Sequence, residues 1–400
     1  MLIRKTRLAL AVAAIFALPV SAFATNGILP VGNGMVSQGM GGAGLANAGE
    51  AAAGMDNPAL ISQTGNAIGL GWTIFNPERK VDASALGGSV VKSDSTMFAI
   101  PQGAVTARIN SDWSWGLMAY AMGGMNTDYS TGPFAPAPGW NSPETVNLQG
   151  MILAPTGSYA INPNISVGLS VLLGYETFTY RNMFGTGASG QGTETGATVK
   201  LGVDAKVTQS IAVGAEYQPK LSMGQINSFK QFLGGFGFTG NAGLDLPASY
   251  GVGAKFAVAR NVDILADYVY EDWSGVQLFK FFGWKSEPVL KIGAEYRPTR
   301  KWALRVGYNY GKSPIQGGVP AANGMMDAAY ANYPFPAISQ SHITIGAGYK
   351  LDRKATLNAY YLYAPAVTET SSLTNVAKPT PGEKITMYQN SFGIGLNYVF

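Results

Sequence analysis

The chain contains no cysteine and only one histidine, His342, among its 400 residues. Without thiols it has no disulfides, no cysteine-ligated zinc or iron–sulfur site and no thiol nucleophile. A single imidazole excludes a histidine-rich metal site and most acid–base machinery that works near neutral pH. Ser341 adjoins His342, but neighbouring residues in a strand face opposite sides, so the two do not form a hydrolase pair. The sequence therefore predicts a protein that is not an enzyme and uses no cofactor or metal.

Charged residues are also scarce, at 12%, about half the roughly 25% usual in soluble proteins. No apolar run of about 18 residues follows Ala24, so membrane-spanning helices are not expected. Yet 46% of the residues are hydrophobic, and the chain holds 52 Gly and 20 Tyr. Apolarity that is abundant but dispersed is typical of an outer-membrane β-barrel.

The N-terminus has the features of a secretory leader. Three basic residues precede an apolar stretch at residues 8–20, and Ala22-Phe23-Ala24 matches a cleavage site. We therefore expect residues 1–24 to be a signal peptide that is cleaved after Ala24. The leader holds three of the 27 basic residues and none of the 23 acidic ones, which leaves a net charge of +1. That balance offers no basic surface for nucleic acid.

Apolar residues alternate with small or polar ones along many segments, most clearly at residues 391–400. A period of two predicts strands with one apolar face. Short turns, such as residues 260–261, alternate with long Gly- and Pro-rich loops, which is the asymmetry of bacterial barrels. Six short turns and seven long loops predict fourteen strands, from 66–80 through a third strand at 113–122 to 388–400. Because a large secreted β-protein also shows alternation, the aromatic residues at strand ends matter: they predict two interfacial girdles.

About forty residues separate the leader from the first strand. They are rich in Gly and Ala and carry only Glu50 and Asp56 as charges. A flexible tail would be more polar and more charged, and the lumen of a fourteen-stranded barrel is too wide for its own side chains to fill. We therefore expect three parts: the leader at 1–24, a plug inside the lumen at 25–65 and an all-β, antiparallel transmembrane barrel at 66–400.

The order of these features resembles the FadL-type family of outer-membrane transporters. The resemblance rests on the Gly-rich run at residues 39–44, on Asn57-Pro58-Ala59 followed by leucine, and on the fourteen-stranded barrel ending in Phe400. It implies transport of long-chain fatty acids and other hydrophobic compounds, with the plug residues Asn57, Pro58 and Ala59 taking part in gating. The partners expected are a hydrophobic small molecule, outer-membrane lipid and, through Phe400, the barrel-assembly machinery; we expect a monomer.

Two long loops are unusually apolar. Apolar patches on a surface commonly mark a binding site, and two such loops adjacent in strand order suggest a groove that captures an apolar ligand. The alternative is a hydrophobic cluster that only orders the loops. The candidate ligand-binding residues are Phe229, Phe232, Phe236, Phe238, Phe279, Phe282 and Trp284.

Two basic residues at the outer strand ends, Arg181 and Lys285, resemble the basic residues that surround the ligand head group in the family. A carboxylate needs such a partner where it leaves water, and arginine offers a bidentate fork; a solvated loop charge is the alternative reading. Gly123 and Gly124 resemble the interruption of the third strand that gives the family a lateral opening, although an ordinary loop start would look the same.

These features predict passive uptake of hydrophobic compounds, with long-chain fatty acids as the first expectation. Monoaromatic hydrocarbons, taken up by the same route, are the alternative, and a structural or adhesive barrel is a third. An open porin needs a charged constriction and no apolar plug, so the plug and the apolar loops argue against it.

Overall fold

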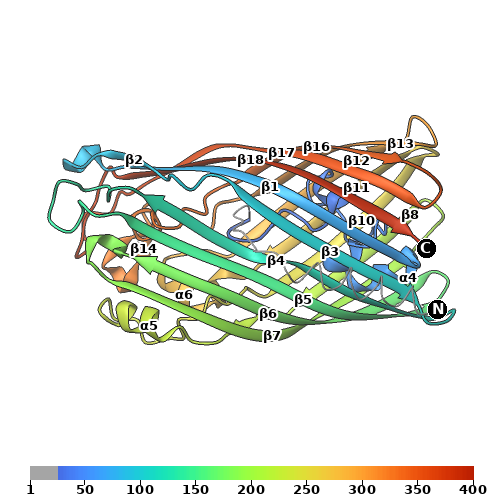
Figure 1. The fold of residues 1–400 in the computed structure, drawn as a ribbon, viewed down its shortest axis with the longest axis horizontal. Coiled ribbons are helices and arrows are strands. Elements are labelled where there is room, and N and C mark those ends of the chain that lie inside the picture. The colour runs from blue at the N-terminus through green and yellow to red at the C-terminus, as the bar shows by residue number, and fades with distance from the viewer. Residues whose placement is uncertain (1–25) are drawn as a thin grey trace.

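A computed structural model describes residues 26–400, so the expected leader lies outside the described residues. Over that range, fourteen antiparallel strands form a closed ring in which β1 pairs with β18 (Figure 1). The strands are β1 (Ala67–Asp82), β3 (Phe98–Arg108), β4 (Trp113–Tyr129), β5 (Glu144–Asn162), β6 (Ile165–Arg181), β7 (Ser189–Lys206), β8 (Ile211–Gln218), β10 (Ser249–Ala259), β11 (Val262–Glu271), β12 (Glu287–Tyr296), β13 (Trp302–Gly311), β16 (Ser341–Lys350), β17 (Ala355–Thr370) and β18 (Lys384–Val399). The predicted barrel is confirmed.

The alternation seen in the sequence becomes the two faces of the wall. In β18, Phe392, Ile394 and Leu396 are 49%, 42% and 40% exposed, whereas Ser391, on the opposite face of the same strand, is buried. The exposed apolar face is the one that lipid would cover. Within residues 26–400, no helix is both long and apolar enough to cross a bilayer.

The two ends of the barrel differ. The C-terminus and the short turns lie at one end, and the long loops gather at the other (Figure 1). The loops carry the remaining elements: η2 (Ser84–Leu86), β2 (Val90–Lys92), η3 (Met183–Gly185), β9 (Ser222–Met223), α5 (Asn227–Gly234), η4 (Trp273–Gly275), α6 (Gln277–Phe281), β14 (Pro320–Ala321), η5 (Ala322–Gly324), β15 (Met326–Asp327) and α7 (Ala328–Ala331).

Residues 26–66, which we call the plug, fold inside the ring. They form the short helices α2 (Met35–Gln38), α3 (Ala53–Asp56), η1 (Pro58–Leu60) and α4 (Ile61–Thr64). Gly41, at φ 68°, shows why the segment is rich in glycine: a Cβ there would lie 2.7 Å from the backbone of Tyr308 in the wall. Only glycine allows this left-handed conformation and this closeness together.

Inward-facing charged side chains hold the plug through its backbone. The Asp267 carboxylate accepts the N–H groups of Gly44 and Leu45, at 2.7 and 3.0 Å. The Lys291 ammonium donates to the carbonyl of Val31 at 2.8 Å, and Lys200 donates to a second plug carbonyl at 3.1 Å. Because most of these groups are buried, such charge-assisted bonds fix the plug firmly.

Candidate functional site

The apolar loops meet over the long-loop end in one aromatic cluster. Five of the seven predicted aromatic residues are at most 9% exposed there, and Phe232 and Phe236 are half-buried on its edge. The expectation of an exposed groove is therefore wrong for Phe229, Phe238, Phe279, Phe282 and Trp284, because other loops cover them. Their role in binding a ligand stays a prediction.

The covering residues come from loops that sequence reasoning did not single out. Phe134, Trp140, Phe184, Tyr330 and Tyr333 pack with one another, with ring centroids 4.9 to 6.3 Å apart. Each lies in a long loop, so loop position together with aromatic character was the available signal. The cluster closes the lumen from above.

A buried carboxylate ties this cluster to the wall. The hydroxyl of Tyr333 donates to both oxygens of Glu144, at 2.7 and 2.8 Å, and the main-chain N–H of Phe184 donates to one of them at 2.9 Å. The hydroxyl of Tyr129 in turn donates to the carbonyl of Tyr333 at 3.0 Å. The hydroxyl groups of these rings are thus satisfied, as buried tyrosines require.

Beneath the cluster, a cavity of about 90 Å³ separates the plug from the wall. Leu29 and Pro30 of the plug line one side, and Tyr120, Met122 and Ile152 of the wall line another. Lysine and glutamate side chains also reach it, among them the lysines that hold the plug. The cavity is small and part apolar, so it suits a compact guest.

The wall beside this cavity is not continuous. Pairing between β3 and β4 begins at Arg108 with Ser114 and stops at Gly103 with Ala119. Beyond that point β3 pairs only with β1, and β4 pairs only with β5. We call the two unpaired edges, residues 98–102 and 120–127, the seam.

The sequence of the seam explains why pairing ends there. Pro101 has no N–H and is tolerated at an unpaired edge. Met122 is an extra residue in β4, because Ala121 pairs with Met151 and Gly123 with Gly150. Such a bulge bends the strand away from its neighbour. The seam closes again above, where Asp94 donates its N–H to the Asp128 carbonyl at 2.7 Å.

Gly123 lies at this bulge with φ 141°, and Gly124 follows it, paired with Gln149. The structure therefore places the two predicted glycines at the interruption of β4. A narrow space of about 10 Å³ lies behind the seam and shares Tyr120 and Ala121 with the internal cavity. The internal cavity and the space behind the seam are thus neighbours that share lining residues; gating at Gly123 and Gly124 stays a prediction.

The predicted plug residues Asn57, Pro58 and Ala59 lie together against the wall. Asn57 is fully buried; its amide donates to the carbonyls of Leu45 and Val203, at 2.7 and 2.9 Å. Its side-chain oxygen accepts the N–H of Ala59 at 3.1 Å, which caps η1. These contacts make the motif an anchor of the plug, and a part in gating remains a prediction.

Arg181 and Lys285 are not brought together. Arg181 ends β6 on the exposed face of the wall, and Lys285 is exposed just before β12. β7, β8, β10 and β11 separate the two strands. Neither residue lines the internal cavity, so the structure does not form the head-group site that the sequence suggested.

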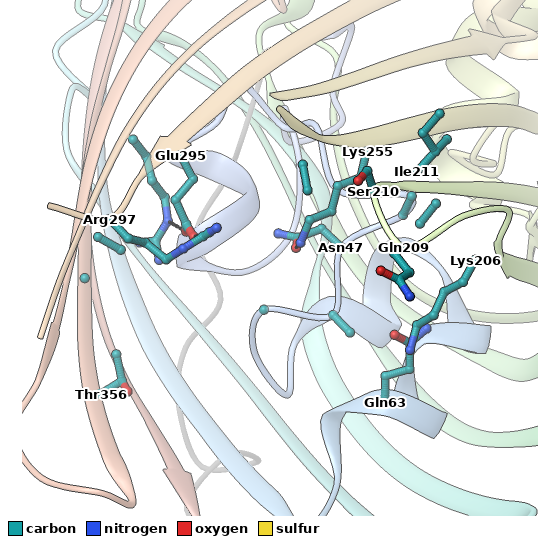
Figure 2. A pocket seen from close by; sticks show the side chains of 18 of the residues that line it. Asn47, Gln63, Lys206, Gln209, Ser210, Ile211, Lys255, Glu295, Arg297 and Thr356 are labelled. Atoms are coloured by element: carbon teal, nitrogen blue, oxygen red, sulfur yellow. Dashed lines mark hydrogen bonds and ion pairs between the residues drawn. The ribbon is translucent and has the colours of Figure 1, made fainter. Parts of the chain in front are cut away.

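The short-turn end holds a cavity of about 1120 Å³ below the plug. Figure 2 shows the Glu295–Arg297 pair on one side of it and Lys206, Gln209 and Gln63 on the other. Further ion pairs join Arg297 and Lys255 to Asp263, at 2.8 and 3.2 Å. This mouth is charged and polar, and such a lining disfavours an apolar compound. No group of three or more His, Asp and Glu side chains within residues 26–400 is arranged to hold a metal ion.

Comparison with known proteins identifies one family and several solved structures with a similar fold. The sequence profile described as "Outer membrane protein transport protein (OMPP1/FadL/TodX)" matches residues 21–400. The P. putida toluene transporter TodX superposes with a TM-score of 0.71 at 19% identity, covering 92% of this chain and 99% of that one. A Pseudomonas aeruginosa FadL homologue gives 0.66 at 16%, covering 95% and 100%. The Ralstonia pickettii toluene transporter TbuX gives 0.65 at 18%, covering 92% and 98%. No curated protein sequence matches the chain.

Proposed function

Because the chain belongs to the OMPP1/FadL/TodX family of bacterial outer-membrane transport proteins, we propose that it is a passive channel for monoaromatic hydrocarbons. The family transports hydrophobic compounds and is not enzymatic. A compound first meets the aromatic cluster at the extracellular end, then occupies the internal cavity, and leaves sideways through the seam into the bilayer.

The size of the internal cavity supports a small substrate. A cavity of about 90 Å³ is smaller than the apolar cavity of roughly 150 Å³ that accommodates benzene, so it leaves room for a small substrate at most. An extended long acyl chain needs a pocket several times longer than this cavity. Two of the similar structures are toluene transporters by name, which supports the same substrate class.

The seam is the observation that carries the proposed route. It lies beside the cavity, because Tyr120 and Ala121 line both the cavity and the space behind the seam, whereas the way to the periplasm passes the plug and the charged mouth of Figure 2. An apolar compound gains free energy by moving into lipid, and the charged and polar lining of the mouth offers it no such gain.

Size-matched substitutions test the route. Ala121→Trp fills the junction of cavity and seam, and Ala257→Trp places the same ring in the periplasmic mouth, which Ala257 lines. We expect initial uptake of labelled toluene by whole cells with intact lipopolysaccharide to fall at least tenfold for Ala121→Trp and to stay near wild type for Ala257→Trp. The reverse order would exclude lateral exit, and no toluene uptake by wild type would exclude the substrate class.

One buried cation supports long-chain carboxylates as a second candidate substrate class. Arg79 points into the lumen, is 5% exposed, and lies 5.6 Å from the ring centroid of Phe98. It donates to Ser93 and to the carbonyl of Ser95, while its Nε has no partner. None of the ion pairs formed within residues 26–400 includes Arg79. A carboxylate that reached it would meet an uncompensated charge.

A further inference from the structure

Two neighbouring periplasmic turns are built alike. Residues 299–301 read Thr-Arg-Lys and residues 352–354 read Asp-Arg-Lys. In each, the first side chain accepts the main-chain N–H groups two and three residues later, at 3.2 and 3.1 Å in one turn and 2.7 and 2.8 Å in the other. These bonds fix both turns locally, so each Arg-Lys pair is presented in the same way.

Both lysines lie over tyrosines of the girdle. The Lys301 ammonium is 5.9 Å from the ring centroid of Tyr349, and the Lys354 ammonium is 5.9 Å from that of Tyr398. Trp302, 45% exposed on the outer face, packs on Tyr349 at 4.7 Å. Aromatic residues of this kind mark the level of lipid headgroups. The two cations therefore lie at headgroup depth at the rim of the barrel, where Arg300 and Lys301 also border the periplasmic mouth.

The four basic side chains are exposed. Arg300, Lys301, Arg353 and Lys354 are all exposed, and none joins an ion pair formed within residues 26–400. The one acid in these turns, Asp352, already accepts two N–H groups. β17 alone lies between the strands of the two tyrosines, so the two pairs stand roughly 10 Å apart by strand spacing.

We propose that this basic doublet is a binding site for an anionic phospholipid of the periplasmic leaflet, with cardiolipin as the best fit. Each Arg-Lys pair takes one phosphate, through the guanidinium fork and the ammonium. Two pairs about 10 Å apart suit a headgroup with two phosphates, while the acyl chains lie along the apolar wall below Trp302. The charge complementarity and the girdle at the membrane surface single out a lipid as the occupant.

The test compares two charge-matched variants of the full chain. K301Q/K354Q removes both stacked ammoniums, and K206Q/R260Q removes two basic residues from other short turns. Each protein is titrated in detergent with cardiolipin, phosphatidylglycerol or phosphatidylethanolamine, and retained lipid is counted by native mass spectrometry; heat-modified gel mobility checks folding.

We expect wild type to retain cardiolipin over phosphatidylethanolamine and K301Q/K354Q to lose at least tenfold in affinity, since each interfacial cation is worth about fivefold. K206Q/R260Q should bind like wild type. Equal losses in both variants would reduce the effect to general surface charge and overturn the site. Competition by millimolar inorganic phosphate, or equal retention of phosphatidylethanolamine, would overturn it as well.

Discussion

Gly123 in the barrel wall lies directly against the main-chain carbonyl of Ile28 in the plug. A Cβ on Gly123 would lie 2.6 Å from that oxygen, and the residue holds φ 141°. Ile28 is fully buried. The bulge that interrupts β4 and the start of the plug therefore fit each other, and a shift of either one requires the other to move.

Gly123→Ala should distort this junction. A side chain at that φ and at that distance strains the backbone, which costs about 1–3 kcal/mol. We expect a lower unfolding temperature and reduced toluene uptake. Gly157→Ala is the control, because a Cβ there has open space within 4 Å in the same sheet. Similar behaviour of the two variants would show that Gly123 is an ordinary strand glycine.

The plug anchors make a second prediction. Asp267→Ala with Asn57→Ala removes the carboxylate that holds Gly44 and Leu45 and the amide that holds Val203. Each lost charge-assisted bond contributes about 1.5–3 kcal/mol, so the plug should loosen within an intact barrel. Single-channel conductance in planar bilayers should rise, and deletion of residues 33–55 should raise it further.

Asp263→Ala is the control for that experiment. Asp263 is buried and faces inward like Asp267, but its ion pairs are with Arg297 and Lys255 in the wall. The single-channel conductance of the Asp263→Ala variant should stay near that of wild type. Unchanged conductance after deletion of residues 33–55 would mean that the plug does not block the lumen.

The wall could be predicted from alternation alone, whereas the interruption at Gly123 and Gly124 was predicted only through the family resemblance. Alternation is a local property, so it predicted fourteen strands and the third strand at 113–122. The structure extends that strand to Tyr129, past residues 120–125, where every residue is buried and alternation is lost. There the plug packs against β4, a contact between distant parts of the chain. A hydrophobic cluster of the two apolar loops was the alternative prediction, but its covering residues were missed for the same reason: Trp140 and Tyr333 lie far in sequence from the loops that they pack with.

The half-buried rings on the edge of the cluster should act in capture. Phe232→Ser with Phe236→Ser removes apolar surface worth roughly 1.5–3 kcal/mol per ring when fully covered. We expect the toluene concentration for half-maximal uptake to rise about tenfold with normal expression. Leu86→Ser, in a different loop and 36% exposed, is the control. An uptake curve that overlaps wild type would remove these two residues from the capture site.

The folded state of the extracellular loop that holds Glu383 should become less stable as pH rises. Burial raises the pKa of the Glu383 carboxyl from 4.5 to about 8, although a hydrogen bond from Ser371 opposes the shift. The folded loop holds the proton while the open loop releases it, so stability falls between pH 5 and 8. The protection of residues 371–383 against hydrogen exchange, taken relative to the intrinsic exchange rate at each pH, should fall over that range in wild type. Glu383→Gln, which mimics the protonated acid, should keep a constant protection, and Asp112→Asn at an exposed turn should follow wild type.

The substrate class can be decided by comparing substitutions on the outer face of the barrel with a substitution in its lumen. Arg181 and Lys285 are exposed and far apart in strand order, so Arg181→Gln with Lys285→Gln should leave uptake of both toluene and oleate unchanged. Arg79→Gln differs, because it removes a buried cation that joins none of the ion pairs formed within residues 26–400. A charge-assisted bond contributes about 1.5–3 kcal/mol. If oleate enters, its uptake should fall about 10- to 100-fold in Arg79→Gln, while toluene uptake should change little because a hydrocarbon has no charge to lose. If oleate uptake instead falls in the Arg181→Gln with Lys285→Gln variant and is unchanged in Arg79→Gln, the carboxylate head group is bound at the outer face and not by Arg79.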